Sequence, residues 1–208
     1  MKRVLPVLRE DDAPLWAIVT LLWVASLYLM IALFSATGIL SPALNLYLAQ
    51  PVLWGTLACV GWLGYRLLPS RPAVQMPLAA FAVLAGVIQF ILFFLAGLIF
   101  GFGQSPYGHS FFVLLGNCLY VAAMTVGVEM GRAYLALVTG KKKPLLALFL
   151  VTFLFTLVNI SPAQYGLLSA PGSAFLFAGK TLLPLLARNI LATFLVMLGG
   201  PAASVAYM

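Results

Sequence analysis

Long uninterrupted apolar stretches recur along this chain of 208 residues, and they restrict its fold more than any other feature. Each stretch is close to the roughly 20 residues that a helix needs to cross the hydrocarbon core of a bilayer. Polar and apolar residues do not alternate within them, as the strands of a membrane barrel would require. With 64% hydrophobic and 7% charged residues, the composition differs from that of a soluble domain. The sequence therefore predicts an all-α, multi-pass protein of the plasma membrane.

Prolines, glycines and basic residues divide the chain into six predicted spans within a single helical domain, residues 1–208. The spans are residues 15–36, 43–68, 78–102, 111–138, 145–160 and 181–207. Pro51 is expected to kink the second span, because proline lacks the N–H group that a helix needs. The segment 161–180 is long and apolar, and it is expected to lie on the membrane surface or to fold back between helices.

The basic residues are distributed unequally between the two sides of the predicted bundle. Eight of the eleven lie on one side, and they are Lys2, Arg3, Arg9, Arg66, Arg71, Lys141, Lys142 and Lys143. Only Lys180 lies in a segment on the other side. The excess of basic residues predicts that the N-terminus and, after six crossings, the C-terminus are cytoplasmic. The lysine triplet is expected to contact anionic lipid headgroups of the bilayer, whereas no nucleic acid partner is expected, because no basic patch extends beyond the loops.

A set of polar residues lies inside the predicted spans, where ionisable groups are costly and are expected to face the bundle interior. This predicted buried seam consists of Glu129, Arg132, Arg188 and Gln89. Glu129 and Arg132 share one helical face, so they can form an intrahelical pair; Glu129 with Arg188, across two helices, is the alternative. Gly127 and Gly131 flank the acid at a spacing that lets another helix backbone approach. A structural ion pair that fixes helix register is favoured over a substrate or proton site.

A second candidate site is predicted on the outer face, opposite to the basic loops. Its residues are Tyr107, His109, Asn117 and Asn159. His109 is the chain's single histidine, and a metal site needs more ligands than this. No serine and lysine occur in a recognisable peptidase motif, and no glycine-rich phosphate loop is present. The sequence therefore predicts no metal, no cofactor and no catalytic residue, and it favours a protein that is not an enzyme.

Several stretches in the second half of the chain form a pattern in their order and spacing. They are AGLIFGFGQSPYGHS (96–110), GVEMGRAYLALVTG (127–140), TLVNISP (156–162) and LLPLLARNILATFLVMLGGPAASVAYM (182–208). Together they resemble the multi-span membrane region of large archaeal signal-peptidase-I-like proteins. The resemblance implies a membrane module that accompanies a peptidase part, and it carries over no catalytic residue. It also implies that Glu129 and Arg132 take part in packing or in contact with a partner.

Two hypotheses of function follow from these observations. The first is a noncatalytic membrane scaffold or accessory subunit with a membrane protein partner, linked to protein export or signal-peptide processing. The alternative is a small-solute binding or transport protein, because 208 residues in six spans is also the size of the substrate-binding subunits of vitamin importers. An outward pocket lined by the outer-face residues would favour the alternative.

Overall fold

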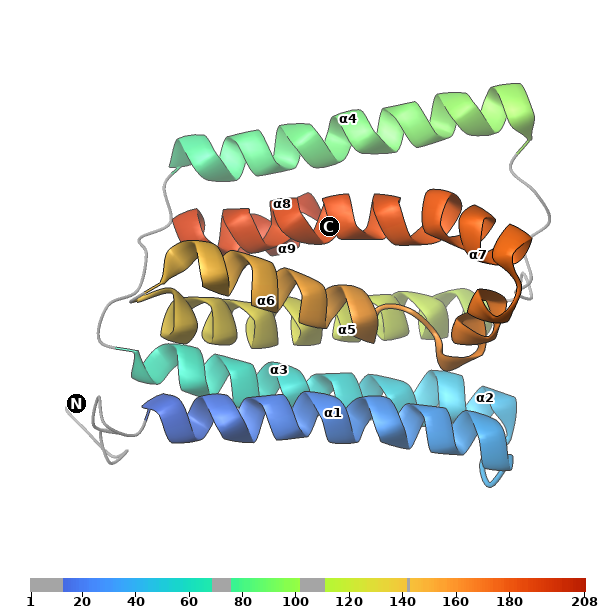
Figure 1. Cartoon of the computed structure of the whole chain (residues 1–208), viewed down its shortest axis with the longest axis horizontal. Coiled ribbons are helices and arrows are strands. Elements are labelled where there is room, and N and C mark those ends of the chain that lie inside the picture. Colours follow the sequence, from blue (N-terminus) through green and yellow to red (C-terminus); the bar gives the residue numbers. More distant parts are fainter. Residues whose placement is uncertain (1–12, 69–75, 102–110, 142) are drawn as a thin grey trace.

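The computed structural model describes residues 13–68, 76–101, 111–141 and 143–208, which form helices lying side by side (Figure 1). The elements are α1 (Ala13–Thr37), α2 (Pro42–Leu44), η2 (Asn45–Ala49), α3 (Gln50–Leu67), α4 (Met76–Phe100), α5 (Phe111–Gly140), α6 (Pro144–Val158), η3 (Pro162–Ser169), α7 (Pro171–Phe177), η4 (Ala178–Leu182), α8 (Leu183–Gly199) and α9 (Pro201–Tyr207). Every regular element within these ranges is helical, so the predicted all-α class is confirmed.

Five helical stretches of the described chain are long and apolar enough to cross a membrane. They are Pro14–Thr37, Pro42–Arg66, Ala80–Ile99, Phe111–Gly140 and Pro171–Gly199. Helix α6 is also apolar but has 15 residues. At 1.5 Å per residue it is about 22 Å long, which is less than the roughly 30 Å of a bilayer core. The character of a helical membrane protein is therefore supported, whereas the sixth crossing and the plasma membrane location stay predictions.

Two π-helical turns occur where proline interrupts a long helix. The turn η2 ends just before Gln50 and Pro51, and η4 ends just before Leu183 and Pro184. A proline ring clashes with the carbonyl group four residues earlier and donates no hydrogen bond to it. The wider π turn makes room for that carbonyl group, so the helix continues through each proline. A π turn thus precedes Pro51, and the kink predicted there stays a prediction.

The predicted last span, residues 181–207, is wrong at both of its ends. The helix begins at Pro171 and runs through α7, η4 and α8, so it includes half of the segment 161–180 that was expected to be a loop. It ends before Gly200, whose φ of 72° lies in the region that favours glycine. Helix α9 then turns back and packs against α4, α8 and α5. Met208 therefore lies near the middle of the bundle's long axis (Figure 1), and the cytoplasmic location of the C-terminus stays a prediction.

The described basic residues of the loops gather at one end of the bundle. Helix α1 begins, α3 ends, α5 ends and α6 begins at this end (Figure 1), which carries Arg66, Lys141 and Lys143. We call it the basic end and the other the opposite end. Lys141 and Lys143 are exposed, as contact with lipid headgroups requires, and Lys142 lies outside the described residues. Which end faces the cytoplasm stays a prediction.

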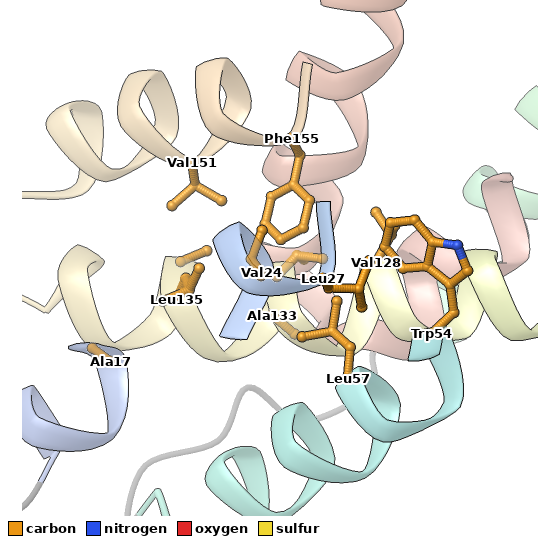
Figure 2. Packing of buried hydrophobic residues seen from close by; sticks show 12 residues of the cluster. Ala17, Val24, Leu27, Trp54, Leu57, Val128, Ala133, Leu135, Val151 and Phe155 are labelled. Carbon is orange, nitrogen blue, oxygen red and sulfur yellow. The ribbon is translucent and has the colours of Figure 1, made fainter. Parts of the chain in front are cut away.

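The main apolar core lies between α1, α3, α5 and α6. Figure 2 shows Phe155 of α6 close to Val24 and Leu27 of α1, with Leu57 of α3 on the other side of this cluster. These side chains are almost completely buried. The core holds α5 in place from three sides, and α5 carries the ion pair described below.

Glycines allow α3 and α5 to approach each other closely. A Cβ atom at Gly61 of α3 would lie 2.6 Å from the backbone carbon of Met130, and one at Gly127 of α5 would collide with the carbonyl oxygen of Trp54. Side chains at these positions would force the helices apart, because real Cβ atoms do not approach backbone so closely. The close backbone approach predicted beside Glu129 is therefore present at Gly127.

Candidate functional site

Arg132 on α5 is completely buried and is held mainly by α8. Its Nη1 donates to the backbone carbonyl of Asn189 at 2.9 Å and to the hydroxyl of Thr193 at 3.3 Å, and its Nη2 donates to Oδ1 of Asn189 at 2.5 Å. Nη2 also lies 3.2 Å from Oε1 of Glu129, three residues earlier on the same helix. The guanidinium carbon is 5.1 Å from the ring centre of Phe155, within cation–π range. Arg132 therefore ties α5 to α8 and α6.

Further buried hydrogen bonds extend this tie into a polar layer across three helices. Thr152 of α6 donates to the hydroxyl of Thr193 at 3.1 Å, and that hydroxyl donates to the carbonyl of Asn189 at 2.8 Å. The side chain of Asn159 reaches Oδ1 of Asn189 at 3.5 Å. Thr152 and Thr193 were not among the predicted site residues. The spacing of Asn189 and Thr193, four apart in an apolar helix, is the signal that could have indicated Thr193.

Glu129 has a side chain that is 1% exposed, and its two carboxylate oxygens have different environments. Oε1 pairs with Arg132, so the intrahelical alternative of the two predicted pairings is the one that forms. Oε2 accepts no hydrogen bond from the described residues. Glu129 lines a cavity of about 270 Å³, which we call the inner cavity and which Arg188, Asn159 and Met208 also line.

Arg188 is exposed, in contrast to the prediction that it belongs to a buried seam. Successive residues of a helix point about 100° apart, so Asn189 can face α5 while its neighbour Arg188 faces away. Arg188 lines both the inner cavity and a second one of about 610 Å³, the polar cavity. The polar cavity is also lined by Gln89, Gln164, Lys180, Thr181 and Tyr207. Gln89 is half-buried, so the predicted seam divides into a buried ion pair and a cavity lining.

An apolar cavity of about 470 Å³ adjoins the polar one between α4, α8 and α9. The two cavities share four lining residues, which are Gln89, Phe93, Leu191 and Tyr207. The rest of the apolar cavity is lined by Phe81, Leu84, Ala85, Ile88 and Leu92 of α4. The inner, polar and apolar cavities therefore follow one another through the bundle.

The predicted outer-face site is assembled only in part. Asn159 lines both the inner and the polar cavity. Asn117 is half-buried and lines none of the three cavities described above. Tyr107 and His109 lie outside the described residues. Of the four predicted residues, Asn159 is thus the one that the structure places at a cavity.

The polar cavity carries an excess of positive charge. Lys180 and Arg188 both line the polar cavity, and no described carboxylate does. Glu129 is the single acidic residue in the segment 13–208, and it is paired with Arg132. The other three acidic residues are residues 10–12, which lie outside the described residues.

Comparisons of the chain with protein-family models, curated proteins and solved structures found no match. The function is therefore argued from the cavities and the charges that line them. The resemblance to signal-peptidase-like membrane regions stays a prediction.

Proposed function

We propose that this protein binds a small negatively charged ligand within the membrane, in the polar cavity, with Arg188 and Lys180 as cationic contacts. The proposal develops the solute-binding alternative raised by the sequence. One observation carries it: two cations line one cavity, while the single acid of the segment 13–208 is paired with another arginine. Cations within membrane-spanning helices are costly unless they find a partner, and a bound anion would be that partner.

The spacing of the two cations suits one ligand. Lys180 and Arg188 are eight residues apart on one continuous helix, which is about 12 Å of rise. Both side chains are long and flexible, so they can converge on a ligand between them. The amide groups of Gln89 and Gln164 line the same cavity, and each can donate to an oxygen of an anion.

The buried pair has a different role in this proposal. Four hydrogen-bond or ion-pair contacts of Arg132 go to α8 and to Glu129, so both of its Nη groups are engaged in holding the helices together. Glu129 contributes a carboxylate to the inner cavity. That carboxylate repels an anion, which favours binding in the polar cavity over the inner one.

The test is to purify the protein from its native membrane in mild detergent and to identify retained small molecules by native mass spectrometry. The wild type is expected to retain an anionic compound. Arg188→Gln and Lys180→Gln should each lower its retention about tenfold, because a hydrogen bond to a charged group contributes about 1.5–3 kcal/mol. Lys143→Gln, at the basic end, is the matched control and should retain it fully. A wild type without any bound anion, or equal retention in all four proteins, would contradict the proposal.

A second candidate function is the accessory subunit linked to protein export, and helix α4 favours it. Helix α4 contacts the rest of the bundle mainly through α9 and α8. Large apolar side chains such as Phe90, Phe94 and Ile99 are exposed along it. A photo-crosslinker at Phe90 in native membranes would give one discrete protein adduct if a partner covers this face, and only lipid adducts otherwise.

A further inference from the structure

The polar and apolar cavities lie in a consistent order along the bundle. Helix α4 starts at the basic end (Figure 1). The residues of α4 that line the apolar cavity lie between Phe81 and Phe93, whereas those that line the polar cavity are Gln89 and Phe93. The continuous helix of η4 and α8 runs the other way, and along it the polar cavity extends from Lys180 of η4 to Leu191 of α8. Leu191 is the one α8 residue that also lines the apolar cavity. The apolar cavity therefore lies on the basic-end side of the polar cavity.

We infer that the ligand is an amphiphile, with an anionic headgroup in the polar cavity and a hydrocarbon chain in the apolar cavity. This inference rests on the proposed function, because it assigns a chemical class to the ligand of the same site. A small soluble anion would use Lys180 and Arg188 but would leave the adjoining apolar cavity without a role. An amphiphile uses both cavities, and burial of its chain adds favourable free energy for each methylene group.

The dimensions agree with a chain that lies along the membrane normal. From Phe81 to Phe93 is twelve residues, or about 18 Å along α4. Half of the bilayer's hydrocarbon core, the depth of one leaflet, is about 15 Å. Leu84, Ile88 and Leu92 line the cavity and are also exposed, so a chain can enter sideways from the lipid.

The residues at the junction of the two cavities are themselves amphipathic. Tyr207 has an apolar ring and a polar hydroxyl, and Gln89 has an apolar stem and an amide. Side chains of this kind occur where an apolar region meets a polar one. If the headgroup of the ligand ends at this junction, the headgroup lies among polar side chains and the hydrocarbon chain lies among apolar ones.

The test compares three probes on the full-length protein in nonionic detergent, by native mass spectrometry titration. Lysophosphatidic acid has a chain and an anionic headgroup, glycerol 3-phosphate has only the anion, and lysophosphatidylcholine has the same chain on a zwitterionic headgroup. We expect lysophosphatidic acid to bind at least about tenfold more tightly than either of the others. Arg188→Gln should weaken it, and Lys180→Gln serves as a second charge variant if Arg188→Gln does not fold.

A matched pair on α4 tests the hydrocarbon part. Ile88 lines the apolar cavity and Val87 does not, although their side chains are equally exposed, at 49% and 48%. Ile88→Gln should weaken lysophosphatidic acid binding severalfold and leave glycerol 3-phosphate binding unchanged, whereas Val87→Gln should change neither.

The outcomes separate the inference from the proposed function. If glycerol 3-phosphate binds as tightly as lysophosphatidic acid, and Arg188→Gln weakens both, the amphiphile is wrong but the anion site stands. If lysophosphatidylcholine binds as tightly as lysophosphatidic acid and Arg188→Gln has no effect, the cavity binds chains alone and both ideas are overturned. Binding of none of the three probes also overturns both.

Discussion

Arg132 and Arg188 show how one residue type takes two roles in neighbouring helices. Arg132 points into the packed interior, where the carbonyl and side chain of Asn189 accept hydrogen bonds from it. Arg188 precedes that same asparagine in the chain, but it points toward the cavities. The guanidinium of Arg132 lies on the side of α8 that packs against α5, whereas that of Arg188 lies on the side of α8 that lines the cavities. A buried arginine whose two Nη groups bind neighbouring helices stabilises the bundle, and an exposed one within the membrane is available for a ligand.

Replacing the buried arginine should destabilise the protein strongly. Arg132→Gln would leave the Glu129 carboxylate without its cation and the Asn189 carbonyl without this donor. We expect the free energy of unfolding to fall by about 3–5 kcal/mol, as when one partner of a buried ion pair is removed. Reversible unfolding in mixed micelles, followed by circular dichroism, measures the change.

The matched control is Arg188→Gln, which removes an exposed arginine from the adjacent helix. Its effect on the unfolding free energy should stay within about 0.5 kcal/mol, as for most exposed positions. Glu129→Gln should lie between the two, because the amide oxygen still accepts a hydrogen bond from Arg132. If Arg188→Gln proved the most destabilising of the three, the structural role assigned to Arg132 would be wrong.

At the scale of the helices, glycine allows the close contact between α3 and α5. We expect Gly61→Ala to destabilise the protein by about 1–3 kcal/mol, because the new methyl group would meet the backbone of Met130 and overpack the interface. Gly55→Ala is the control on the same helix, since nothing lies within 4 Å of a Cβ atom there. It should be neutral or stabilising by up to about 1 kcal/mol through helix propensity. The midpoint of thermal unfolding in detergent distinguishes them, and similar midpoints would argue against the close α3–α5 packing.

Helix α9 is short but joins two parts of the molecule. It has seven residues and packs against α4 on one side and against α8 and α5 on the other. Its Ser204 is fully buried, and its Tyr207 reaches the polar and apolar cavities. The reversal at Gly200 therefore forms part of the cavity wall, and the wall depends on one backbone conformation that only glycine adopts readily.

At the scale of the whole molecule, the predicted topology places the two ends of α6 on opposite sides of the membrane. Lys143 precedes α6 and Ser169 ends the helix η3 that follows it, and both are exposed. In a background without Cys59 and Cys118, Ser169→Cys should react with an impermeant maleimide in intact cells. Lys143→Cys should react only after permeabilisation. Reaction of both in intact cells would show that the 15-residue α6 does not cross.

The sequence by itself determined the helical membrane class, because a chain in hydrocarbon must satisfy its backbone hydrogen bonds within each span. It also indicated the Glu129–Arg132 pair, since residues three apart on a helix meet whatever surrounds them. Only the tertiary structure decided that Asn189 binds Arg132, that Arg188 faces the cavities and that α9 turns back at Gly200. These features depend on how each helix is rotated against its neighbours. Within uniformly apolar spans, the hydrophobic pattern carries little information about that rotation.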